Sequence, residues 1–286
     1  MSVANEIKPA QEEGAARRWR RSAANAQAFL RLFGRKPRTT AVRPTWRAPS
    51  RLAAWGLLML ALVGGAMALI DAPSIIAARG LPDNVILTFV WLTDFGTSDW
   101  FLVPLGFALV GIAAVATPAL AQPSRAVLAA LAVRLAFVFA AIALPGLVVT
   151  IGKRLIGRAR PFVGGHEDPF LYHPLSWTPD YASLPSGHAT NVFAALVAVG
   201  LVWPRMRLVM LFYALIIAAS RVIVWAHHPS DVIAGAAAGI FGALLVRDWF
   251  AARGRGFAIG PDGKVATLPG PSWRRLMRVA RQIAAP

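Results

Sequence analysis

Residues 52–70 read LAAWGLLMLALVGGAMALI, a run of 19 amino acids without a single charge. At about 1.5 Å per residue, a helix of this length spans the roughly 30 Å hydrocarbon core of a bilayer. Further apolar runs follow along the chain at residues 101–117, 135–151, 189–203, 208–226 and 232–246. The sequence therefore predicts an all-α integral membrane protein, built as a bundle of six membrane-spanning helices.

Three segments need a closer reading than hydropathy gives. The runs 189–203 and 232–246 are only 15 residues long, so we expect their helices to continue into the polar segments beside them. Residues 81–95 are apolar but contain Asp83 and Asp94. We expect them to form a short interfacial helix on the outer face. Read instead as an extra span, they would put the two termini on opposite sides of the membrane.

The composition supports a membrane protein and excludes several functional classes. Of the 286 residues, 57% are hydrophobic and 15% are charged, whereas a soluble domain averages about 25% charged residues. The chain contains no Cys. This excludes a disulfide scaffold, a thiolate nucleophile, a Cys-ligated metal and an iron–sulfur cluster.

The charge of the chain is concentrated in two tails. The 30 Lys and Arg residues outnumber the 13 Asp and Glu residues, which gives a net charge of +17. Residues 1–51 are predicted to form a basic, mostly disordered tail with a short amphipathic helix near residues 23–33, and residues 248–286 form a second basic tail. Six spans place both tails on one side, which the positive-inside rule makes the cytoplasm. We expect these tails to lie on anionic lipid rather than on nucleic acid, and Arg134 to snorkel to the headgroups on the same side.

One outer loop breaks this charge rule. Four cations lie within eight residues at the outer end of the third span: Lys153, Arg154, Arg158 and Arg160. All five His residues also fall in outer segments or at their edges: His166, His173, His188, His227 and His228. Cations and imidazoles that converge on one membrane face indicate chemistry on a phosphate group.

Three short patterns on that face each allow two interpretations. KRLIGRARP (153–161) is either a set of phosphate ligands or a basic patch on lipid headgroups. PSGH (185–188) precedes an apolar helix whose first N–H groups can face an anion, or it is only a turn with a helix cap. SRVIVWAHHPSD (220–231) joins a cation, an imidazole and a carboxylate, or it is a polar patch at a helix end.

Taken together, the three patterns resemble the signature of the type 2 phosphatidate phosphatase superfamily. These proteins are also called lipid phosphate phosphatases and are related to the soluble vanadium haloperoxidases. The signature is KxxxxxxRP, PSGH and SRxxxxxHxxxD, and the three stretches match it without a departure. The resemblance covers residues 52–247 and implies a six-span lipid phosphatase domain between the two tails. Six spans point to the phosphatases rather than to the haloperoxidases.

The resemblance also implies catalytic roles for three residues. His227 is the nucleophile that forms a phosphohistidine, Asp231 orients it, and His188 is the general acid. The spacing of the motif selects His227 over its neighbour His228. We further expect Ser230 to cap the sixth span.

The remaining motif residues are implied to bind phosphate: Lys153, Arg160, Ser186, Gly187 and Arg221. No cofactor and no metal is predicted, because three cations already supply the charge that a metal would supply. We expect His166 and His173 to be loop residues without a catalytic role.

These expectations describe an enzyme, a metal-independent phosphoric ester hydrolase in a bacterial inner membrane with its site facing the periplasm. Candidate substrates are phosphatidate, phosphatidylglycerol phosphate, undecaprenyl pyrophosphate, a sphingoid phosphate and a lipid A phosphate. The extra cations Arg154 and Arg158 favour a pyrophosphate. The alternatives are a lipid-to-lipid phosphotransferase with the same site and a catalytically silent lipid-binding protein. The sequence carries no prediction of oligomeric state.

Overall fold

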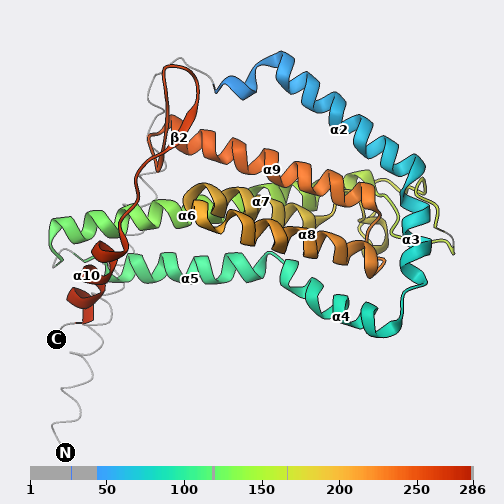
Figure 1. The fold of residues 1–286 in the computed structure, drawn as a ribbon, viewed down its shortest axis with the longest axis horizontal. Coiled ribbons are helices and arrows are strands. Elements are labelled where there is room, and N and C mark those ends of the chain that lie inside the picture. The colour runs from blue at the N-terminus through green and yellow to red at the C-terminus, as the bar shows by residue number, and fades with distance from the viewer. Residues whose placement is uncertain (1–26, 28–43, 118–119, 166, 285–286) are drawn as a thin grey trace, which may run out of the picture.

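The structure is a computed structural model that describes residues 27, 44–117, 120–165 and 167–284. The amphipathic helix expected near residues 23–33 and the side chain of His166 lie outside these described residues. The described chain is mostly helical, and Figure 1 shows its long helices running side by side with shorter elements at both ends.

Five helical segments are long and apolar enough to cross a membrane: Pro49–Leu69, Asp83–Val115, Gln122–Ile156, Pro204–Ile223 and Pro229–Ala252. Within them lie the helices α2 (Pro49–Leu69), α5 (Asp99–Val115), α6 (Gln122–Ile156), α8 (Arg207–Ile223) and α9 (Pro229–Ala252). The prediction of a multi-pass helical membrane protein is therefore confirmed, with five candidate spans in the described part of the chain. The remaining predicted span corresponds to α7 (Gly187–Val202), an apolar helix of 16 residues.

The end of the bundle that carries the site is closed by two short helices. The helix α3 (Asp71–Arg79) follows α2 directly, and α4 (Asp83–Thr93) occupies the segment that we expected to form an interfacial helix. A 3-10 turn, η2 (Asp94–Gly96), joins α4 to α5. In Figure 1, α3 and α4 lie at the end of the bundle opposite the C-terminal segment.

The C-terminal tail is ordered, which corrects the prediction of an all-α protein with disordered tails. The strands β1 (Phe257–Ile259) and β2 (Val265–Thr267) form an antiparallel hairpin, and α10 (Trp273–Ala284) follows them. The aromatic ring of Phe257 is buried 4.7 Å from that of Phe137 on α6. Apolar burial of this side chain therefore fixes a segment that charge alone suggested would be loose.

Arg134 has a different role from the predicted one. Its side chain does not snorkel to the membrane surface, because it is only 8% exposed. The guanidinium donates hydrogen bonds of 2.8 Å to the carbonyl oxygens of Ala130 and Leu268. Arg134 therefore attaches the segment after the hairpin to α6, in keeping with the rule that buried cations need hydrogen-bond partners.

Close contact between α7 and α9 positions the start of α7. Gly235 and Gly239, four residues apart on α9, face α7. A Cβ atom on Gly235 would overlap the carbonyl oxygen of Ser186, and one on Gly239 would overlap that of Thr190. Small residues at this spacing let two helix backbones approach closely in a membrane. The two glycines thereby fix the PSGH segment against the first turns of α9.

We predict that Gly239→Ala destabilises the protein even though Ala favours a helix. The added methyl group meets backbone, which cannot rotate away, and overpacking of this kind costs about 1–3 kcal/mol. The matched control is Gly65→Ala, because a Cβ atom there meets no other atom within 4 Å. Thermal unfolding in detergent measures both variants. A Gly239→Ala protein as stable as the Gly65→Ala protein would contradict the packing argument.

Candidate active site

The predicted site residues come from separate elements that meet at one end of the bundle. Lys153 lies in the last turn of α6, Arg160 in the loop after it, and Arg221 in the last turn of α8. Ser186 precedes α7 as its N-cap, and Asp231 lies in the first turn of α9. The ends of four helices therefore converge on the residues that the three patterns singled out.

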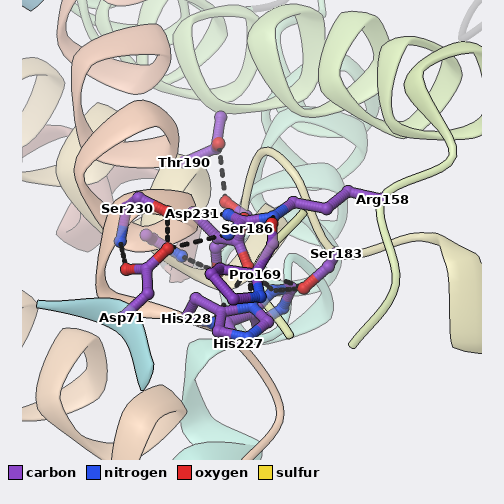
Figure 2. Close-up of polar contacts among 11 residues, drawn as sticks. Asp71, Arg158, Pro169, Ser183, Ser186, Thr190, His227, His228, Ser230 and Asp231 are labelled. Atoms are coloured by element: carbon purple, nitrogen blue, oxygen red, sulfur yellow. Dashed lines mark hydrogen bonds and ion pairs between the residues drawn. The ribbon is translucent and has the colours of Figure 1, made fainter. Parts of the chain in front are cut away.

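His227 and Asp231 face each other in a fully enclosed position. The Nδ1 atom of His227 lies 3.7 Å from Oδ2 of Asp231, and the imidazole is 2% exposed. The hydroxyl of Ser183 lies beside both, 3.4 Å from Nδ1 of His227, and donates a 2.6 Å hydrogen bond to Oδ2 of Asp231 (Figure 2). Asp231 thus orients the imidazole in part through Ser183, a residue outside the three patterns.

The surroundings of His227 keep its imidazole neutral. Burial lowers its pKa to about 4, the carboxylate of Asp231 opposes this shift, and the guanidinium groups of Arg221 and Arg160 add to it. At neutral pH the ring is uncharged, so one nitrogen keeps the lone pair that a nucleophile needs.

His228 is enclosed as completely as His227 but has a different place. Its backbone N–H donates a 2.9 Å hydrogen bond to Oδ2 of Asp231, and its extended backbone makes it the N-cap of α9. The predicted cap, Ser230, is instead the second residue of that helix, because Pro229 occupies the first position. The Nδ1 atom of its ring lies 3.5 Å from Oδ2 of Asp231 and faces the backbone N–H of that residue, as a capping side chain does.

The N-terminus of α7 opens toward a cation. Ser186 is buried, its hydroxyl oxygen accepts a long 3.5 Å hydrogen bond from the N–H of Ala189, and its own N–H donates to the carbonyl oxygen of Asp231 at 2.9 Å. A Cβ atom on Gly187 would meet only the Nζ atom of Lys153, at 3.9 Å. A side chain at Gly187 would therefore occupy the space between the helix N-terminus and an ammonium group, a favourable place for an anion.

His188 lies beside this space. Its imidazole is within the electrostatic influence of Lys153, Arg160, Arg221 and His227. A Cβ atom on Gly96 would come within 2.9 Å of Cδ2 of His188, so the turn η2 packs directly on the ring. The structure thus brings together all eight residues that the sequence proposed for the site.

Two buried guanidinium groups keep unused donors. Arg221 donates from Nη1 to the hydroxyl of Thr93 at 2.6 Å, while its Nε atom has no partner among the described residues. The Nε atom of Arg160 is also buried and has no hydrogen-bond partner among the described residues. Burial lowers the pKa of Arg160, and the charge of Asp180 partly offsets this. Because buried donors are nearly always paired in folded proteins, these two side chains have the chemistry to receive an anion.

The two extra cations do not favour a pyrophosphate as expected. Arg158 is fully buried and occupied by Asp71, Asp231 and Ser230. Arg154 donates from Nη1 to the carbonyl oxygens of Trp177 and Thr178, so it braces the loop before α7. Local pairing therefore accounts for both side chains without a second phosphate group.

Three residues of the site were missed from the sequence: Asp71, Thr93 and Ser183. Each is a small polar residue whose partner lies on another element. Asp71 offered one signal, because it is a charge placed directly after an apolar run. His173 lies in the loop, where its ring is 5.3 Å from that of Tyr181. Among the described residues, no three His, Asp or Glu side chains gather as a metal site.

A buried neutral imidazole beside a carboxylate and two incompletely paired guanidinium groups, at one end of a membrane bundle, is typical of an enzyme that transfers phosphoryl groups. Comparison with known proteins agrees, since residues 134–255 match the profile of the PAP2 superfamily. A lipid A 1-phosphatase of Rhizobium johnstonii is 37% identical over 216 residues, which cover 75% of this chain and 84% of the relative. One of Rhizobium etli is 36% identical over 217 residues, with coverage of 75% and 92%.

Among solved structures, a transmembrane PAP2-type phosphatidylglycerolphosphate phosphatase from Bacillus subtilis matches 79% of this chain and 94% of its own, with 16% identity and a TM-score of 0.42. The family match and the Rhizobium relatives decide the family. The chain belongs to the PAP2 superfamily and is a membrane lipid phosphatase of that family.

We predict that the imidazole of His227 stays neutral down to about pH 5. Its lowered pKa means that protonation occurs as the pH falls toward about 4, rather than near the usual value of about 6.5. NMR titration of the His-labelled protein in detergent measures this, and the His227→Gln variant identifies the signal among the five His residues of the chain. A midpoint at pH 6 or above would contradict the enclosed site.

Proposed function

We propose that this phosphatase removes the 1-phosphate of lipid A or of a closely similar glycolipid. The observation that carries the proposal is the 37% sequence identity to a lipid A 1-phosphatase. The alignment extends over 216 residues and covers 84% of that relative. The space between Gly187 and Lys153 supports a monophosphate substrate. Arg158, one of the two extra cations that suggested a second phosphate, is paired with two carboxylates.

In this mechanism the Nε2 atom of neutral His227 attacks phosphorus. The N–P bond forms as the bond from phosphorus to the lipid oxygen breaks. The protonated imidazole of His188 gives its proton to that leaving oxygen and becomes neutral. Asp231 holds the Nδ1–H of His227 and stabilises the positive charge that the ring acquires. A water molecule then attacks phosphorus and passes a proton to the neutral His188 while the N–P bond breaks. Inorganic phosphate leaves, His227 is neutral again, and His188 is protonated again.

The phosphate oxygens are bound by Lys153, Arg160 and Arg221, together with the Ser186 hydroxyl and the Gly187 N–H. Charge spreads over three equatorial oxygens in the transition state of phosphoryl transfer. The unpartnered Nε atoms of Arg160 and Arg221 support their assignment as ligands. Guanidinium groups held in place beforehand stabilise this charge without reorganisation.

We further propose that α7 is the sixth span and that the site faces the periplasm. In Figure 1 the start of α2 and the C-terminal hairpin lie at one end of the bundle, and α3 lies at the other. Because α7 packs against α6, α8 and α9, a helix of 16 residues crosses most of the bilayer without exposing its polar N-terminus to lipid. The basic tails then lie on the cytoplasmic side, as the positive-inside rule expects.

The substrate is tested with purified protein in detergent and a panel of lipid A, phosphatidate, phosphatidylglycerol phosphate and undecaprenyl pyrophosphate. We expect the fastest phosphate release from lipid A, and mass spectrometry of the product shows loss of the 1-phosphate. EDTA leaves the rate unchanged, because protein cations supply the charge on the phosphate. Faster turnover of phosphatidate than of lipid A would overturn the substrate assignment.

The nucleophile is tested with two matched variants. We predict that His227→Asn lowers kcat by roughly a thousandfold or more, because the residue that bonds to phosphorus is lost. His228→Asn retains most activity, since Asn is a good helix N-cap. Phosphate release with lipid A measures both rates, and the far-ultraviolet circular dichroism of each variant serves as the folding control. A larger loss in His228→Asn would show that the neighbouring imidazole is the nucleophile.

A further inference from the structure

A buried cluster of three charges links α3 to the site. The guanidinium of Arg158 donates to Oδ2 of Asp71 at 2.7 Å and to Oδ1 of Asp231. Asp71 also accepts a 2.9 Å hydrogen bond from the N–H of Ser230 and a short one from its hydroxyl. None of these four residues has any exposed surface, and Figure 2 shows Asp71 and Ser183 reaching Asp231 and its neighbours from opposite sides.

The charges of this cluster do not cancel. Burial by itself would lower the pKa of Arg158, but the carboxylates of Asp231 and Asp71 outweigh it and raise that pKa, so the guanidinium stays charged. Two carboxylates and one guanidinium leave one net negative charge beside a neutral His227. When Nε2 of His227 bonds to phosphorus and keeps its Nδ1–H, the ring gains one positive charge. Cluster and ring are then neutral together, which is the favourable state in a buried site.

We propose that Asp71 is a positioning residue that neutralises Arg158, so that the charge of Asp231 remains available to His227. This rests on the proposed role of His227 as nucleophile. Without Asp71, Arg158 cancels Asp231 alone, and the charge acquired by the ring stands uncompensated in the protein interior. Asp71 thus contributes a third carboxylate to the catalytic charge balance, from a helix that holds none of the motif residues.

Other charged or titratable side chains face His227 from each element packed against it. They are Asp231 on α9, Arg221 on α8, Arg160 in the loop after α6 and His188 at the start of α7. None of them is altered in the variants below. A change in the titration of His227 in those variants therefore reports on Asp71 and Arg158.

The test compares Asp71→Asn, Arg158→Gln and the double variant. Asn keeps an oxygen for the Ser230 N–H, but its NH2 group replaces the oxygen that accepts from Arg158 and from the Ser230 hydroxyl, so the charge and these two hydrogen bonds are lost together. We expect Asp71→Asn to lower kcat by roughly tenfold to a hundredfold with KM nearly unchanged, since a buried charge acts on the transition state through a low dielectric. The double variant again has one net negative charge in the cluster. We expect its log kcat to lie at least halfway from the value of Asp71→Asn back to that of the wild type.

Activity in the double variant at or below that of Asp71→Asn overturns the proposal, because a purely structural network only weakens as members are removed. The NMR titration of His227 is a second readout. We expect the midpoint to fall in Asp71→Asn and to rise in Arg158→Gln. Unchanged midpoints in both also overturn the proposal, whichever lipid is the substrate. If the His227 midpoints shift as expected but the wild-type enzyme releases phosphate from no lipid in the panel, the proposed function is refuted and the role of Asp71 in the charge balance is not.

If Asp71→Asn does not fold, Asp71→Glu replaces it. Glu keeps the charge and lengthens the side chain by one methylene group. Recovery of folding and of kcat to within about tenfold of wild type supports the charge role. If Asp71→Glu also fails to fold, and the titration midpoint of His227 is unchanged in Arg158→Gln, the charge role of Asp71 is contradicted.

The helix α10 carries a second, independent inference. Its exposed arginines share one face: Arg274, Arg275, Arg278 and Arg281. Val279, on the apolar side of the helix, is buried against the protein, while Trp273, which is 73% exposed, Met277 and Ile283 remain exposed outside the arginine face. The hydroxyl of Ser124, in the first turn of α6, donates to the side chain of Gln282 at 2.6 Å, so α10 lies where a spanning helix begins.

We propose that α10 lies in the headgroup layer of an anionic membrane leaflet. Its apolar face then covers acyl chains, and its arginines pair with lipid phosphates, as is usual for amphipathic helices with a cationic polar face. The occupant is lipid rather than protein, because the contact with Ser124 holds α10 at the first turn of the span Gln122–Ile156, where a membrane boundary falls.

The chain lacks Cys, so single spin labels report on this helix directly. We compare labels at Met277→Cys and Arg278→Cys in nanodiscs with phosphatidylglycerol or with phosphatidylcholine alone. We expect the label at 277 to be accessible to oxygen and shielded from a water-soluble nickel complex, and the label at 278 to show the reverse. The contrast increases with phosphatidylglycerol. Lys264→Cys, whose side chain is 82% exposed, is the aqueous control. Labels at 277 as accessible to nickel as those at 264 would overturn the proposal.

Discussion

The contact of Arg158 with two carboxylates holds the site together. This guanidinium ties the loop after α6 to Asp71 on α3 and to Asp231 on α9. The same Asp231 accepts from Ser183 and from the backbone of His228, and thereby places the loop before α7 and the start of α9. Removing one partner of a buried ion pair is costly, because the other charge is left uncompensated. The geometry around His227 therefore depends on Arg158, which the signature leaves unspecified, and on Asp71, which lies outside the three sequence patterns.

The cations of the site divide into two groups with different roles. Arg158 is satisfied within the protein, and Arg154 is bound to loop carbonyls. Arg160 and Arg221 keep buried Nε donors without partners in the described chain. A phosphate that enters the space beside Gly187 pairs with the second group only. The first group of cations thus stabilises the structure, and the second binds substrate. Burial of His227, with the nearby charges of Arg221 and Arg160, keeps its imidazole neutral and nucleophilic.

Hydropathy and motif spacing predicted much of this molecule, because both are local properties of the chain. The apolar runs correspond to helices, and the eight motif residues meet at one end of the bundle. The contributions of Asp71 and Ser183 could not be predicted, since each depends on which distant element lies opposite. The same holds for Arg134, whose partner Leu268 lies far along the chain. The hairpin was missed because each of its strands is only 3 residues long and lies within a basic tail. The close approach at Gly235 and Gly239 was not predicted either, since it depends on α7 lying opposite.

The central claim is that the nitrogen of His227, enclosed by Asp231 and Ser183, bonds to phosphorus. Rapid acid-free quenching of the enzyme with lipid A labelled at the 1-phosphate, followed by peptide mapping, tests this most directly. The account predicts a label that is stable to base, labile to acid and located on His227. Label on His228, or turnover at the normal rate with no labelled protein at any time, would contradict it.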